Sequence, residues 1–231
     1  MKMRTVISLR SARGGLLSAA MAGSLLFGVT GCGGDDEGSK TPKDYKVVAG
    51  TQLCGGDAVS ADASRALKVI TGSSRFEASE ERSTTAQAAA DLIAASPIAT
   101  TTKIICRVFT PIGTPDFQLR ATWRLADDAP TDDPSAPKFT ELKMGDKTVA
   151  AADMAYVYFT CRSDEVPSSS EGAHIVVGVE HWAVPREPDG NIKALKNAYA
   201  TVAHSFSLAM AKELRCDNNG GLPPKPVLVP A

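Results

Sequence analysis

The sequence lacks an excess of charge of either sign, and it lacks the short motifs that mark common catalytic and nucleotide-binding sites. Its 231 residues contain 25 Lys and Arg against 26 Asp and Glu. No strongly basic face can neutralise phosphates, so nucleic acid is not an expected partner. A Gly-x-Ser-x-Gly nucleophile elbow and a Gly-x-Gly-x-x-Gly phosphate turn are both absent, which leaves hydrolysis and nucleotide binding without a motif. We therefore expect no cofactor.

The apolar run near the amino terminus is too short to cross a bilayer as a helix. Residues 14–29 carry no charge, and they follow four basic residues with no acid among them. Sixteen helical residues rise about 24 Å, which is less than the roughly 30 Å of a hydrocarbon core. A basic segment followed by a short apolar one is typical of an export signal. We expect residues 1–31 to be a signal peptide.

The end of this segment, Val29-Thr30-Gly31-Cys32, resembles the bacterial lipobox, with Val29 where Leu is commoner. The resemblance implies that diacylglycerol is attached to the Cys32 thiol and that the chain is then cut before this residue. Two acyl chains anchor a protein durably, whereas one binds reversibly. We expect the mature chain on the extracytoplasmic face of the cell membrane, held through lipid on Cys32. The alternatives are an ordinary secretory signal or an uncleaved anchor.

The segment that follows, residues 32–50, begins with small, polar and charged residues and shows no apolar periodicity. We expect it to be a flexible tether with a root-mean-square span of roughly 25 Å. The mature chain has 21 basic and 26 acidic residues, a net charge of −5. Because no polybasic stretch accompanies Cys32, the lipid itself must hold the chain on the membrane.

Four cysteines remain after Cys32, and in an exported chain an even number is typical of disulfides. They are widely separated and form no Cys-x-x-Cys pair, so we expect no metal site. Three pairings are possible, and the loops they close stabilise by similar amounts. Cys106 and Cys161 both lie in expected strands, whereas Cys54 precedes the first helix and Cys216 follows the last one. These positions favour the pairs Cys106–Cys161 and Cys54–Cys216.

The apolar pattern predicts a single α+β domain over residues 51–216. Helical spacing indicates two short helices, from Ser60 to Gly72 and from Thr84 or Thr85 to Ser96. A longer helix is expected at about 191–214. Alternation between them predicts an antiparallel sheet of five or six strands, on which the helices pack. The expected strands cover 103–110, 117–125, 139–142, 147–149, 154–161 and 173–184, and residues 217–231, with four prolines, are expected to be a disordered tail.

The titratable residues suggest no catalytic set. His174 and Glu180 share one face of an expected strand but lie six residues apart, roughly 20 Å, so they cannot touch. His181 falls on the apolar face of that strand, and His204 lies off the apolar stripe of the last helix, where we expect it to be solvated. The acidic run at 127–134 lacks the spacing of a calcium-binding loop. We assign no catalytic residue and no metal ligand.

The lipobox, the polar tether, Leu53-Cys54-Gly55-Gly56 before an alanine-rich helix and the single cysteines together resemble actinobacterial surface lipoproteins of uncharacterised function. The resemblance implies an envelope location and no known activity. We interpret the chain as a non-catalytic binding or envelope-associated module that contacts a cell-surface protein or a small ligand. The alternative is an extracytoplasmic hydrolase with a noncontiguous site. A solute-binding component is disfavoured, because one domain lacks the two lobes that close around a ligand.

Overall fold

The computed structural model describes residues 45–95, 101–131, 136–166, 172–182 and 188–231. These residues all belong to one compact unit, Thr41–Ala231. The expected signal peptide and most of the expected tether, including Cys32, lie outside the described residues. Within the part of the chain that is described, no helix is long and apolar enough to cross a membrane.

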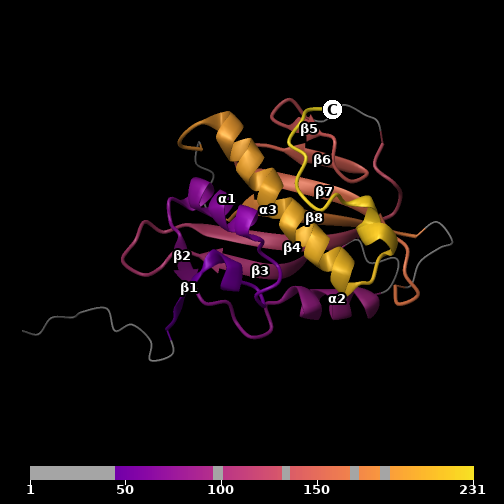
Figure 1. The fold of residues 1–231 in the computed structure, drawn as a ribbon, viewed down its shortest axis with the longest axis horizontal. Coiled ribbons are helices and arrows are strands. Elements are labelled where there is room, and N and C mark those ends of the chain that lie inside the picture. The colour runs from indigo at the N-terminus through magenta and orange to yellow at the C-terminus, as the bar shows by residue number, and fades with distance from the viewer. Residues whose placement is uncertain (1–44, 96–100, 132–135, 167–171, 183–187) are drawn as a thin grey trace, which may run out of the picture. The chain divides into compact units, whose positions relative to one another are not determined.

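The unit is built on a six-stranded antiparallel sheet, as the alternating pattern predicts. The strand order is β3-β4-β8-β7-β6-β5, and each neighbouring pair is antiparallel. The chain meanders from β5 to β8, while β4 pairs with β8 in the middle of the sheet (Figure 1). The strands are β3 (Lys103–Phe109), β4 (Gln118–Ala126), β5 (Thr140–Leu142), β6 (Lys147–Ala150), β7 (Met154–Cys161) and β8 (Ala173–His181).

Among the described residues, three α-helices accompany the sheet: α1 (Ala61–Thr71), α2 (Thr85–Ile93) and α3 (Ile192–Glu213). The side chains of Ser60, Thr84 and Asn191 each accept a hydrogen bond from a backbone N–H of the first turn, which stabilises a helix start. Gly72 ends α1 in the left-handed conformation that glycine adopts without strain. Figure 1 shows α1 and the long α3 lying across one face of the sheet.

The hydrophobic core fills the space between this face and the helices. On β4, Leu119, Ala121 and Trp123 point into it with at most 2% of their surface exposed, while Arg120 and Arg124 point to the other side and are half-buried. Each large apolar side chain removed from water contributes roughly 1.5–3 kcal/mol. From the helical side the core receives Leu67, Leu92, Tyr199, Phe206 and Met210, each at most 2% exposed.

The amino-terminal boundary of the fold differs from the prediction. Val47–Ala49 forms strand β1, which pairs antiparallel with β2 (Arg75–Glu77). The expectation that residues 32–50 are a tether throughout is therefore wrong for its last residues. Three residues of strand are too few to show a period, and only the pairing with β2, nearly thirty residues later, reveals them.

The carboxyl-terminal segment also differs from the prediction, because residues 217–231 are not a disordered tail. Asp217–Gly221 forms a tight turn in which Asn218, Asn219 and Gly220 have left-handed backbone angles, and Leu222 is only 4% exposed. The last residues add to the edge of β5: the N–H of Lys143 donates to the carbonyl of Val229, and the N–H of Ala231 donates to that of Glu141. Figure 1 shows this yellow segment reaching β5. Proline has no backbone N–H to donate, and it is tolerated here because a segment at the edge of a sheet pairs on one side only.

Candidate functional site

The two disulfides join different partners from those that placement favoured. Cys54 pairs with Cys106 and Cys161 pairs with Cys216, with Cα–Cα distances of 5.8 and 4.9 Å. The predicted pairing of Cys106 with Cys161 is wrong because β3 and β7 are separated by β4 and β8. Three strand spacings are about 14 Å, twice the Cα separation that a disulfide allows. The two bonds instead fasten the amino-terminal turn to β3 and the end of α3 to β7.

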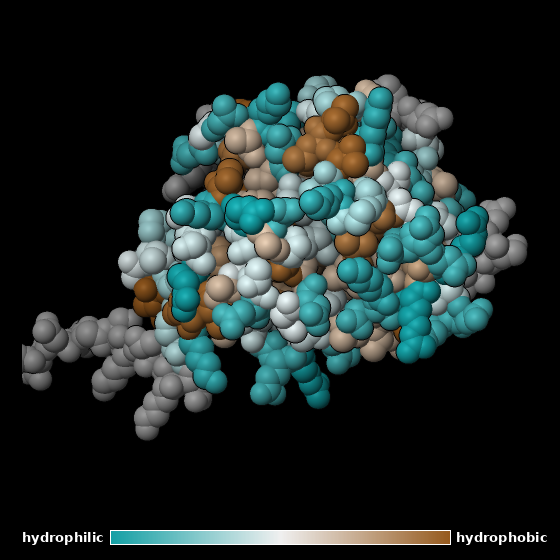
Figure 2. Space-filling model, in the orientation of Figure 1, coloured by the Kyte–Doolittle hydropathy of each residue, from teal (hydrophilic) through white to brown (hydrophobic). Residues whose placement is uncertain are grey.

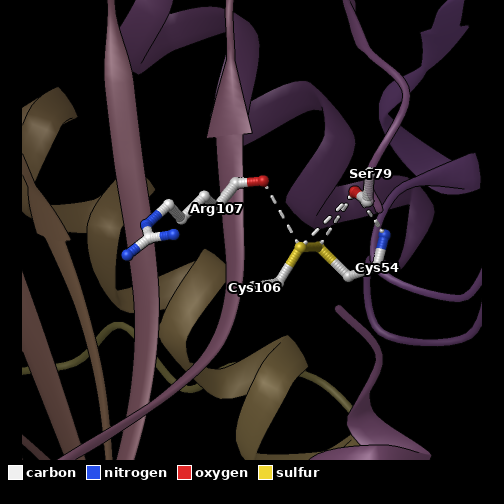
Figure 3. The surroundings of a disulfide bond; sticks show 4 residues. All are labelled: Cys54, Ser79, Cys106 and Arg107. Carbon is white, nitrogen blue, oxygen red and sulfur yellow. Dashed lines mark hydrogen bonds between the residues drawn. A yellow bond between two sulfur atoms is a disulfide. The ribbon is translucent and has the colours of Figure 1, made fainter. Parts of the chain in front are cut away.

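The surroundings of the first disulfide indicate a structural bond (Figure 3). The hydroxyl of Ser79 accepts a 3.0 Å hydrogen bond from the N–H of Cys54 and lies 3.4 Å from the sulfur of Cys106. Both cysteines are fully buried. A reductant or substrate therefore cannot reach the sulfurs in the folded state, and the bond serves to hold the turn against β3.

Charged side chains gather on the outer face of the sheet, which we define as the side opposite the core. Arg107 of β3, Arg120 of β4 and Glu180 of β8 lie in one row across three strands. The Nε of Arg120 donates a 2.6 Å hydrogen bond to Glu180, and its guanidinium lies 3.6 Å from the centre of the Trp182 ring. Arg107 is exposed. With Arg124 on the same face, β3, β4 and β8 carry three arginines against one glutamate there.

Two tyrosines of β7 continue this face. The ring of Tyr156 lies so close to Gly178 that a Cβ there would be 2.8 Å from it, so glycine lets the ring lie flat on β8. Burial, and then the charge of Glu180, raise the pKa of Tyr156. Arg124 lies 6.0 Å from the ring of Tyr158, within the range of a cation–π contact. The outer face thus carries arginine side chains on β3 and β4 and tyrosine side chains on β7.

The histidines do not come together. His174 and His181 stand at opposite ends of β8, roughly 23 Å apart along the strand. The Nδ1 of His174 lies 3.0 Å from the hydroxyl of Thr160, and His181 stacks on Phe117 with ring centres 4.2 Å apart. His174 and His181 therefore form no acid–base pair with each other.

His204 is buried, and the expectation that it is solvated is wrong. It is 3% exposed, and its Nε2 lies 2.8 Å from the carbonyl of Pro223. A carbonyl only accepts, so Nε2 carries the proton. Burial lowers the pKa of His204. The carboxyl-terminal segment covers this part of α3, which the helical periodicity alone could not show.

A shallow groove of about 510 Å³ runs between α1, α3 and the carboxyl-terminal segment. Ala66 and Val69 of α1 face Ala198 and Thr201 of α3, and Pro226 and Leu228 form the third side. These mostly apolar side chains are accompanied by the polar and charged side chains of Asp62, Arg65, Asn197 and Lys225. Figure 2, which views this side of the unit, shows a patch of apolar surface near the carboxyl-terminal segment.

The acidic run expected near 127–134 is only partly in view, since Asp132 and Asp133 lie outside the described residues. Among the residues that are described, no cluster of three or more His, Cys, Asp or Glu side chains could hold a metal ion. The row of Arg107, Arg120 and Glu180 was not predicted as a site. Its members come from three separate strands, and only the strand register brings them together.

Comparisons with known proteins add no relationship: no family model, curated protein or solved structure matches this chain.

Proposed function

We propose that the chain is exported, anchored through lipid on Cys32 to the extracytoplasmic face of the cell membrane, and acts there as a non-catalytic binding module. The observation that supports this most directly is the pair of disulfides, Cys54–Cys106 and Cys161–Cys216. Disulfides persist outside the reducing cytosol and are rare within it. They therefore agree with the export signal and with the lipobox that ends at Cys32.

The folded part of this lipoprotein is a single α+β domain with the short helices, the sheet and the long helix α3 in one core. It extends beyond residues 51–216 to include β1 and the carboxyl-terminal segment. A single domain has no second lobe that could close over a ligand, so in this proposal the partner binds on the surface of the domain.

The outer face is the contact surface in this proposal, and its partner is a cell-surface protein with an acidic patch. Ligand sites for small molecules are mostly apolar, whereas this face carries Arg107, Arg120, Arg124 and Glu180. Arginine and aromatic residues are enriched in protein interfaces, and here the exposed Arg107 lies opposite Arg120, whose guanidinium contacts the ring of Trp182. Three arginines against Glu180 give the β3, β4 and β8 part of the face a positive charge.

The anchor is tested by metabolic labelling with a palmitate analogue. We expect Cys32→Ala to abolish the label, because no other thiol precedes the folded domain. Thr30→Ser is the matched control, since it keeps a small residue at that position and should keep the label. Persistent labelling of Cys32→Ala would contradict the anchor.

The contact surface is tested by placing a photoreactive residue at Arg107 and irradiating intact cells. We expect a discrete adduct with one envelope protein, and we expect Arg124→Glu in the same chain to weaken it several-fold. Lys68 is the control position, because it is exposed on α1, away from the outer face. Equal adducts from positions 107 and 68, or none from 107, would contradict this surface.

A further inference from the structure

The described chain begins beside the turn that connects β3 to β4. The hydroxyl of Tyr45 accepts a 2.7 Å hydrogen bond from the N–H of Ile112, in the middle of that turn. Tyr45 lies thirteen positions after Cys32 in the sequence. A chain of this length reaches at most about 45 Å and, when flexible, spans roughly 20 Å. Lipid on Cys32 would thus keep this turn close to the bilayer.

Two large apolar side chains are exposed at this end of the sheet, which we call the tether end. Ile112 is 51% exposed in the turn, and Trp182 is 49% exposed just after β8. Both lie at the same end, because the N–H of Trp182 donates to the carbonyl of Gln118 at the start of β4. Figure 1 shows β1 and the β3–β4 turn on one side of the domain, and Figure 2 shows apolar surface on that side.

Charge does not dominate the tether end. Two carboxylates near it are held in ion pairs: Glu180 lies 2.6 Å from Arg120, and Asp153 lies 3.8 Å from Lys138. Basic and acidic side chains are therefore mixed at this end, and we expect apolar contact to decide what binds.

We propose that the tether end docks on the lipid bilayer, with Ile112 in the acyl boundary and Trp182 at the level of the headgroups. The proposal rests on the lipid anchor of the proposed function. Tryptophan is enriched at the interface between membrane and water, and a leucine- or isoleucine-bearing surface gains by entering the acyl boundary. The lipid anchor keeps the tether end at a high effective concentration near the bilayer, so a contact of only two apolar side chains is enough for docking. With the tether end on the bilayer, we expect the strands to point away from the membrane and the outer face to remain accessible to a partner.

The two tryptophans of the chain make a direct test. The full-length acylated protein is reconstituted in phosphatidylcholine vesicles with and without bromine on the acyl chains. We expect brominated lipid to quench Trp182, whereas Trp123, at 2% exposure in the core, is the internal reference and stays bright. In Trp182→Phe, the remaining emission should be insensitive to bromine.

Ile112→Ser isolates the role of the turn. We expect it to reduce the quenching of Trp182 several-fold while the protein still sediments with the vesicles. Ile104→Ser is the matched control, because Ile104 is 42% exposed at the opposite end of β3 and should leave quenching unchanged. Near-ultraviolet circular dichroism checks that each variant is folded.

The possible failures separate the anchor from the docking. Sedimentation without quenching in the parent protein would overturn the docking and leave the anchor intact. Quenching that requires anionic lipid would overturn the apolar insertion. A chain that neither carries an acyl group nor sediments would overturn the proposed anchor and this inference with it.

Discussion

Arg120 of β4 and Glu180 of β8 lie directly opposite each other, and the Nε of Arg120 donates a 2.6 Å hydrogen bond to the carboxylate. On its other side Arg120 faces Arg107 of β3, again directly opposite. Directly opposed side chains on neighbouring strands are close enough to interact, and like charges there are destabilising. Glu180 therefore offsets a repulsion that the sheet would otherwise contain.

Glu180→Gln should lower the free energy of unfolding by about 1–2 kcal/mol, because a charged hydrogen bond is lost and two opposed arginines remain. Urea denaturation measures the change. We expect Arg107→Gln to recover part of the loss in the Glu180→Gln background and to be nearly neutral alone. A loss that is the same with and without Arg107 would show that the two arginines do not interact.

Each disulfide should contribute about 4 kcal/mol of stability by the chain-entropy estimate, since the bonded residues are 52 and 55 positions apart. Replacing Cys54 and Cys106 together with Ser, or Cys161 and Cys216 together, should therefore cost similar amounts in denaturant titrations. Peptide mapping under non-reducing conditions should give the two observed pairs. A peptide that joins Cys106 to Cys161 would refute the observed connectivity.

His204 should make the domain less stable as the pH falls. Its pKa in the folded state lies below the ordinary value of 6.5, so the unfolded chain takes up the proton first. The free energy of unfolding should then decrease as the pH drops below about 6.5, and continue to decrease until the folded-state pKa is reached. We expect His204→Gln to flatten the dependence of Tm on pH between 7.5 and 5.5. An unchanged slope would show that other groups produce it.

The carboxyl-terminal segment should protect the edge of the sheet at β5. Removal of residues 224–231 takes away the backbone bonds to Glu141 and Lys143 and leaves an open edge that can pair with another chain. We expect the truncated protein to be less stable and to self-associate more, as measured by light scattering after size-exclusion chromatography. Val229→Ser keeps the backbone bonds and should behave like the parent. Equal association of all three proteins would contradict the protective role.

The sequence predicted the elements better than their partners. Alternation along β4 and the apolar stripe of α3 are local patterns, and the structure confirms both the six-stranded antiparallel sheet and the long helix. The disulfide pairing failed because it depends on strand order, which places two strands between Cys106 and Cys161. The burial of His204 was not predictable, because the residues that bury it belong to the segment 217–231. The Pro and Gly residues of that segment are typical of a disordered tail and do not indicate that Leu222 and Pro223 pack on α3.

The outer face shows the same limit on the functional side. Arg120 and Arg124 are polar positions within an alternating strand, so the sequence alone predicts that this side of the strand faces solvent. The ion pair with Glu180 and the contact with Trp182 were not, because each needs the register of β8 against β4. A site composed of one residue per strand leaves no contiguous motif in the sequence.

The most direct test is intact-mass spectrometry of the chain isolated from membranes of the cells that produce it, before and after reduction and alkylation. We predict an amino terminus at Cys32 that carries diacylglycerol, and four further cysteines that react only after reduction. An unmodified amino terminus together with four freely reactive thiols would contradict the proposal that this is an exported, lipid-anchored protein.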